Sequence, residues 1–269
     1  MLFRRLFLCA LFVGLCAGLI YSAVQRLQII PIIAAAEVFE SALRGEPAAA
    51  VSHHPPGAAA HVHEHDEGAW EPEEGFERTF WNVVSNVLGA VGFSLLLIPV
   101  FAWWDRQRGG EAASLRSGLL WGAVGWLCFF VWPSLGLRPE LPGEVVADIH
   151  ARQAWWLLAV VCAIGGLALL SFVVKGYWRW LGVPLLVLPF LIGAPQADGL
   201  AFAQFAAADA AQMAYLKAQF VVATALASAV QWLAIGAVAG IVIPRWLRPL
   251  LLADSGDRGA LRSSVQRVA

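Results

Sequence analysis

The chain has 269 residues, of which 59% are hydrophobic and only 14% are charged, and its net charge is −1. Water-soluble domains are ~45–50% apolar and ~25% charged, so this composition excludes an ordinary soluble domain and indicates an integral membrane protein embedded in a lipid bilayer. The sequence has no Gly-x-x-x-x-Gly-Lys-Ser/Thr loop and no Gly-x-Ser-x-Gly motif, and its basic tail is short. We therefore predict neither an enzyme nor a nucleic-acid-binding protein.

The first apolar run covers residues 6–24 and follows Arg4 and Arg5. Its length exceeds the ~7–15 apolar residues of a secretory signal, which favours a retained membrane span. A cleaved signal, ending at the small residues near Ser22, is the alternative. Residues 1–36 are thus interpreted as the first span and its exit from the membrane.

A polar segment, residues 37–79, follows the first span and contains a histidine-rich stretch. In an extended chain alternate residues point to the same side, so three of its imidazoles would share one face and the acidic residues the other. Imidazole and carboxylate ligands suit Ni, Co, Zn or Cu, which predicts a metal-binding loop. A solvated low-complexity segment is the alternative. The predicted ligands are His53, His54, His61, His63, His65, Glu64 and Asp66.

Residues 80–243 are expected to form the remaining membrane bundle. A helix of about 20 apolar residues crosses a bilayer core, and four runs approach that length: 80–104, 118–132, 154–174 and 220–243. A shorter run, 181–194, contains Pro184 and Pro189 and becomes just long enough when it is extended back through Tyr177. The sequence therefore predicts an all-α integral membrane protein with about six transmembrane helices. Backbone carbonyls in the proline-broken span are candidate cation ligands.

Other polar residues near and within the spans are weaker candidates. His150 and Asp148 belong to a second polar loop, and they are either a second metal contact or ordinary loop residues. Asn82, Asn86 and Gln231 lie inside apolar runs. They are either part of a cation pathway or partners in hydrogen bonds between helices. Glycine pairs four residues apart indicate close helix packing; they are Gly14/Gly18, Gly118/Gly122 and Gly236/Gly240.

The distribution of charge predicts the orientation. With six spans, twelve basic and four acidic residues lie on one side of the membrane, against six basic and fifteen acidic residues on the other. Because lysine and arginine remain cytoplasmic, both termini are expected in the cytoplasm, including the basic tail of residues 244–269. The histidine-rich loop is then expected outside the cytoplasm.

Several short motifs follow one another in a fixed order along the chain. They run from Gln25-x-x-Gln28-x-x-Pro31 near the first span to Leu188-Pro189-Phe190-Leu191-Ile192-Gly193-Ala194-Pro195, and they include Pro139-Glu140-Leu141-Pro142-Gly143 and Ala151-Arg152-Gln153-Ala154-Trp155-Trp156. Their order and spacing resemble the CbtA family, predicted cobalt transporter subunits of bacteria. The resemblance implies a multi-pass protein of the bacterial inner membrane that takes up cobalt for cobalamin synthesis beside a small one-span CbtB-type subunit. It also implies five spans and often a histidine where this chain has Phe190.

We therefore expect a Co²⁺ uptake subunit with no tightly bound cofactor, whose histidine-rich loop captures the metal. One alternative is a membrane metal-binding or scaffold subunit that does not itself transport. The other is a transporter for nickel, zinc or copper, since imidazole ligands do not select among these metals. Assembly into a homo-oligomer is left open.

Overall fold

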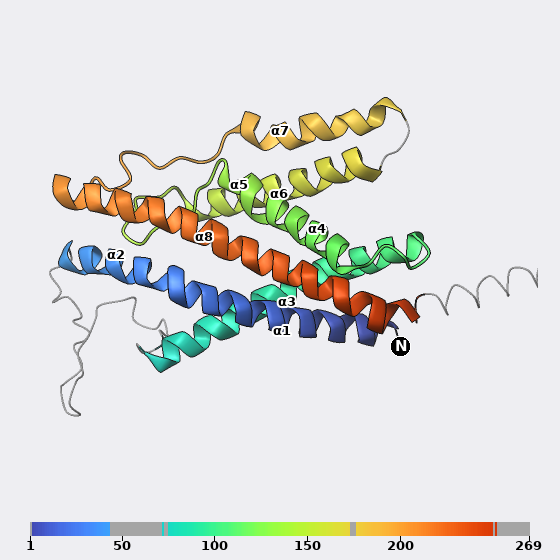
Figure 1. Cartoon of the computed structure of the whole chain (residues 1–269). Coiled ribbons are helices and arrows are strands. Elements are labelled where there is room, and N and C mark those ends of the chain that lie inside the picture. Colours follow the sequence, from blue (N-terminus) through green and yellow to red (C-terminus); the bar gives the residue numbers. More distant parts are fainter. Residues whose placement is uncertain (1, 44–71, 73–74, 173–175, 250, 252–269) are drawn as a thin grey trace, which may run out of the picture.

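A computed structural model describes residues 2–43, 72, 75–172, 176–249 and 251 (Figure 1). Every regular element within these residues is a helix, which confirms the all-α prediction. The α-helices are α1 (Leu2–Gln28), α2 (Ile30–Leu43), α3 (Phe76–Gln107), α4 (Leu115–Trp126), α5 (Trp132–Ser134), α6 (Ile149–Phe172), α7 (Gly182–Ile192) and α8 (Ala207–Val242). Two π-helical turns, η1 (Leu127–Val131) and η3 (Ile243–Leu247), and one 3₁₀ turn, η2 (Tyr177–Leu181), complete the set.

Five of these helices are long and apolar enough to cross a membrane: Leu2–Gln28, Phe76–Gln107, Leu115–Ser134, Ile149–Phe172 and Ala207–Leu247. The structure thus contains the five longer spans that the apolar runs predict. Several extend beyond those runs. Residues 37–43 and 76–79, expected in the polar loop, belong to α2 and α3.

The sixth expected span is the shorter apolar helix Tyr177–Ile192. Its 5 residues of 3₁₀ helix and 11 residues of α-helix span roughly 26 Å, slightly less than a bilayer core of ~30 Å. α7 nevertheless runs antiparallel to α6 and returns the chain toward the start of α8 (Figure 1). The described residues therefore contain five helices of membrane-spanning length and one shorter apolar helix that packs against α6.

The bundle has two ends. At one of them, called the terminal end, α1 begins and η3 ends. The rings of Phe12 of α1 and Trp246 of η3 lie 5.3 Å apart, so these two elements are in contact. At the opposite loop end, residues 135–148 and 193–206 connect helices (Figure 1). The helix α2 also lies at the loop end, where Ala36 joins a buried cluster with Leu141 and Met213.

Glycines bring the central helices into close contact. α1 packs against both α3 and α8, and α8 packs against α4 (Figure 1). A Cβ atom on Gly118 of α4 would lie 2.2 Å from the carbonyl oxygen of Gly236 of α8, and one on Gly14 of α1 would lie 2.4 Å from Cα of Val91 of α3. These contacts confirm that the spaced glycines serve helix packing, as expected in a membrane.

Candidate functional site

The predicted histidine-rich ligands fall outside the described part of the chain: His53, His54, His61, His63, His65, Glu64 and Asp66. His150 and Asp148 are described, and both are exposed where α6 begins. The Asp148 carboxylate accepts a hydrogen bond from the backbone N–H of Ala151 at 2.9 Å, so it caps this helix. Within the described residues, no three His, Cys, Asp or Glu side chains are grouped closely enough to hold a metal ion.

Asn86 contacts the first helix inside the bundle. Its Nδ2 donates to Oε1 of Gln25 at 2.5 Å and lies 3.2 Å from Oγ of Ser22, both on α1. Gln231 is buried on α8, and Asn82 is half-buried on α3. The structure therefore uses Asn86 in hydrogen bonding between α1 and α3, while the pathway role of these three residues stays a prediction.

A polar cavity of about 440 Å³ opens at the loop end. It lies between the α5–α6 connection, the start of α6, the segment after α7 and the side of α8. Its charged lining residues are Arg138, Glu140, Glu144, Arg152 and Lys217. Carboxylates and cations from distant parts of the sequence therefore line one cavity that is large enough for several water molecules.

Two ion pairs cross this cavity. Arg152 of α6 pairs with Glu140, and Lys217 of α8 pairs with Glu144. Burial raises the pKa of the Glu140 carboxyl, although the Arg152 guanidinium beside it acts in the opposite direction. The Arg152 Nε is also buried without a hydrogen-bond partner in the described structure. The loop end is thus charged, partly buried and incompletely satisfied.

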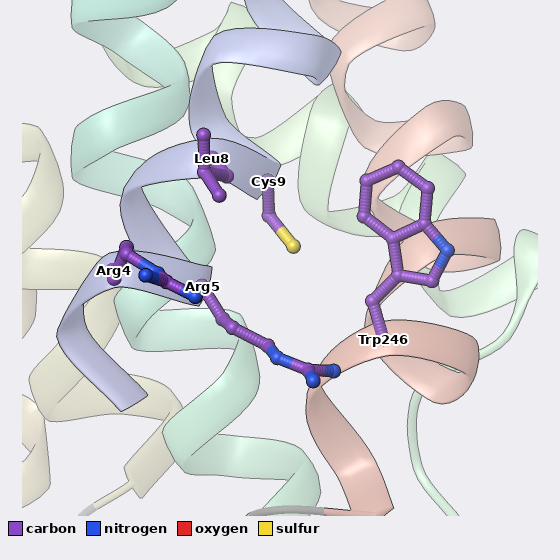
Figure 2. A pocket seen from close by; sticks show the side chains of 5 residues that line it. All are labelled: Arg4, Arg5, Leu8, Cys9 and Trp246. Carbon is purple, nitrogen blue, oxygen red and sulfur yellow. The ribbon is translucent and has the colours of Figure 1, made fainter. Parts of the chain in front are cut away.

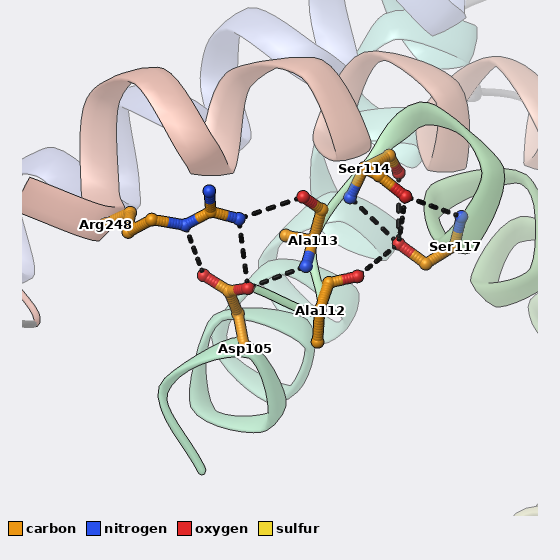
Figure 3. Close-up of polar contacts among 6 residues, drawn as sticks. All are labelled: Asp105, Ala112, Ala113, Ser114, Ser117 and Arg248. Carbon is orange, nitrogen blue, oxygen red and sulfur yellow. Dashed lines mark hydrogen bonds and ion pairs between the residues drawn. The ribbon is translucent and has the colours of Figure 1, made fainter. Parts of the chain in front are cut away.

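The terminal end contains a different ion pair, centred on the fully buried Asp105 of α3 (Figure 3). Arg248 donates through Nε to Oδ2 of Asp105 at 3.1 Å and through Nη2 to Oδ1 at 3.2 Å. The backbone N–H of Ala113 donates to Oδ1 at 2.6 Å, and Arg248 also donates to the Ala113 carbonyl at 2.9 Å. One carboxylate therefore ties together the end of α3, the connection to α4 and the chain just after η3.

The local sequence positions this network. Ser114 and Ser117 form a capping box at the start of α4, which fixes the short connection that presents Ala113 (Figure 3). Asp105 ends an apolar, aromatic stretch of α3, so its carboxylate is buried where the helix reaches the connection. A buried carboxylate needs a cation and hydrogen-bond donors, and this arrangement supplies both.

The proline-broken helix α7 is held by two tryptophans. The indole Nε1 of Trp132 donates to the Leu186 carbonyl at 3.2 Å, and that of Trp155 donates to the Pro189 carbonyl at 3.1 Å. The ring of Phe190 lies 5.5 Å from that of Trp132 and 5.9 Å from that of Trp155. The carbonyls of Leu186 and Pro189, which belong to the predicted cation ligands, therefore accept hydrogen bonds from tryptophans. Phe190 is part of an aromatic cluster.

The sequence alone does not indicate the ion pairs. Asp105 and Arg248 contribute only to the charge of a connection and of the tail, although Trp103 and Trp104 place Asp105 near the end of a span. Glu140 and Arg152 appeared only within family-like motifs. The pairing of Glu144 with Lys217 joins residues 73 positions apart, and nothing in the linear sequence indicates it.

The fold defines the class of this protein: it is a multi-pass helical membrane protein built from apolar helices and a shorter broken one. The family model described as "Probable cobalt transporter subunit (CbtA)" matches residues 3–244. The chain therefore belongs to the CbtA family. Comparison with curated proteins and with solved structures finds no match.

Proposed function

We propose that this chain is the membrane subunit of a bacterial inner-membrane cobalt uptake system, with its histidine-rich segment capturing Co²⁺ outside the cytoplasm. Membership of the CbtA family over residues 3–244 is the observation that carries this proposal. The membrane-length helices supply the scaffold that such a subunit needs.

The orientation rests on charge. Basic residues gather at the terminal end, from Arg4 and Arg5 on α1 to Arg245 and Arg248 at the end of the bundle. Positively charged residues remain on the cytoplasmic side, so the terminal end faces the cytoplasm and the loop end faces outward. The two described helices that flank the histidine-rich segment, α2 and α3, end and begin on the loop-end side (Figure 1).

The loop-end cavity supports a route for the captured metal. Imidazoles of His61, His63 and His65 bind divalent cations at near-neutral pH. A cation released from them can next be bound by the carboxylate oxygens of a nearby acidic site. Glu140 and Glu144 line the cavity on the same side of the bundle. A cation that approaches them would compete with Arg152 and Lys217, which links metal arrival to these ion pairs.

A non-transporting scaffold subunit is the second candidate, and the composition of the spans favours it. The charged residues of the described spanning helices lie toward their ends, and the interior polar residues that we find, such as Asn86 and Gln231, are neutral. Intramembrane charges commonly mark ion pathways. A CbtB-type partner would then contribute to the pathway or respond to the captured metal.

Cobalt flux into liposomes separates the two candidates. The purified chain is reconstituted alone and with the small one-span partner around a cobalt-quenched dye, and dye quenching is followed after cobalt is added outside. We expect quenching in liposomes that contain this chain alone, which would reject the scaffold function. Protein-free liposomes and liposomes with the partner alone are the controls. Cobalt binding by the chain without any flux in either preparation would contradict transport and support the scaffold function.

A further inference from the structure

A cavity of about 290 Å³ lies between the start of α1 and η3 at the terminal end (Figure 2). It is lined by Leu8, Cys9 and Trp246 together with Arg4 and Arg5. Figure 2 shows the Arg5 side chain extending from α1 toward the helix that carries Trp246. The surface of the cavity is almost entirely apolar, so it suits the glycerol and the start of an acyl chain of a larger ligand, with Arg4 and Arg5 beside it for a charged group.

The cavity has positive charge available for a ligand. Arg4 and Arg5 are exposed, and neither is paired with a carboxylate in the part of the chain that the structure describes. Arg248 at the same end is instead committed to Asp105. A guanidinium matches the geometry of a phosphate through paired N–H···O hydrogen bonds, so two free guanidinium groups beside a cavity favour a phosphate ligand.

Exposed aromatic residues place this cavity at the level of the lipid headgroups. Trp103 is 53% exposed, Trp178 57%, Trp180 62% and Trp246 41%, and all lie at the terminal end. Tryptophans gather at the membrane–water interface. Further along α1, away from its first residues, large apolar side chains are exposed on the surface of the bundle; these are Leu11, Phe12, Leu15 and Leu19.

We propose that this cavity binds an anionic phospholipid, with the apolar wall holding the glycerol and the start of an acyl chain and the two arginines holding the phosphate. Arg4 and Arg5 contact the phosphate, Trp246 packs beside the glycerol, and the acyl chains lie along the exposed apolar side chains of α1. Basic pockets between membrane helices bind anionic headgroups in this way. Because the cavity lies between α1 and η3, the bound lipid would bridge the first and last helices of the bundle.

Native mass spectrometry of the purified full-length chain tests the proposal, with phosphatidylglycerol and phosphatidylcholine as probes. We expect the chain to retain phosphatidylglycerol preferentially. The double variant Arg4→Gln/Arg5→Gln should weaken that binding roughly fivefold for each arginine and leave phosphatidylcholine binding unchanged. The variant Arg4→Lys/Arg5→Lys keeps both charges and should lose only part of the preference. Because the lysines keep the positive charge that orients the first helix, this variant separates a lost lipid contact from altered membrane insertion.

Arg116→Gln is the matched control, because Arg116 is exposed at the same end of the bundle but does not line the cavity. It should bind both lipids as the unmodified chain does. Equal retention of the two lipids, or an equal loss in the Arg116 variant, would overturn the proposal. Binding of inorganic phosphate at millimolar concentration without any retention of phosphatidylglycerol would also overturn it, because it would identify the ligand as free phosphate.

Discussion

The two ends of the bundle hold their charges in opposite ways. At the terminal end, one fully buried carboxylate, Asp105, accepts hydrogen bonds from Arg248 and from the backbone of Ala113. At the loop end, the Glu140–Arg152 and Glu144–Lys217 pairs line a cavity. A fully buried carboxylate with several hydrogen bonds fixes the segments around it, whereas ion pairs that line a cavity can exchange partners.

This difference fits the proposed direction of transport. In the proposed orientation the loop end faces outward, so arriving metal would meet first the carboxylates that line the loop-end cavity. At the terminal end, the Asp105 network ties three segments of the chain together. We therefore expect substitutions at the terminal end to act mainly on stability, and substitutions at the loop end to act mainly on cobalt uptake.

The largest effect on stability is expected for Asp105→Ala. Removing this carboxylate leaves the Arg248 guanidinium without its anion and the Ala113 N–H without its acceptor. Breaking a buried ion pair costs about 3 kcal/mol, which corresponds to a fall in melting temperature of roughly 6–12 °C. Thermal unfolding in detergent measures this fall. Glu111→Gln, an exposed acid in the neighbouring connection, should leave the melting temperature unchanged.

A smaller loss of stability, about 1 kcal/mol or roughly 2–4 °C, is expected for Glu144→Gln. The Glu144 side chain is 7% exposed, but its partner Lys217 is 22% exposed and can turn toward water. The same variant should reduce cobalt uptake at limiting cobalt, measured in cells alongside the control Asp209→Asn. A loss of stability as large as that of Asp105→Ala would erase the contrast between the two ends.

The smallest effect concerns pH. Because burial raises the pKa of Glu140 above its ordinary value of 4.5, the folded chain binds this proton more tightly than the unfolded chain does. The resulting stabilisation is complete below pH 4.5 and is lost as the pH rises through the folded-state pKa. Glu140→Gln should therefore remove a shift of at most about 2 °C between acidic and neutral pH. An unaltered pH profile in this variant would assign the shift to other groups.

The sequence predicts the spans well, because a bilayer leaves long apolar runs as the only way to bury the backbone. The start of α8 at Ala207 was expected only at residue 220. The residues between are alanine-rich and form helix, but Asp209 and Lys217 keep them out of the apolar run. Close packing at Gly118 and Gly236 was also predictable, since small residues at four-residue spacing carry that signal.

The ion pairs could not be predicted in the same way. Asp105 and Arg248 are separated by 143 positions, and their meeting depends on how α3 and α8 end at the same side of the bundle. Composition reveals which charges exist, but the partner of each charge is set by helix packing. The predicted histidine-rich ligands depend only on local spacing, and they remain predictions because they lie outside the described residues.

Radioactive cobalt uptake by cells expressing the chain tests the central claim most directly. We expect His61→Ala, His63→Ala and His65→Ala together to reduce uptake roughly tenfold at limiting cobalt, and uptake to recover at saturating cobalt because capture is then no longer limiting. His150→Ala provides a histidine control outside the segment, with a smaller expected effect. Unchanged uptake by the triple variant at limiting cobalt would contradict capture by the histidine-rich segment.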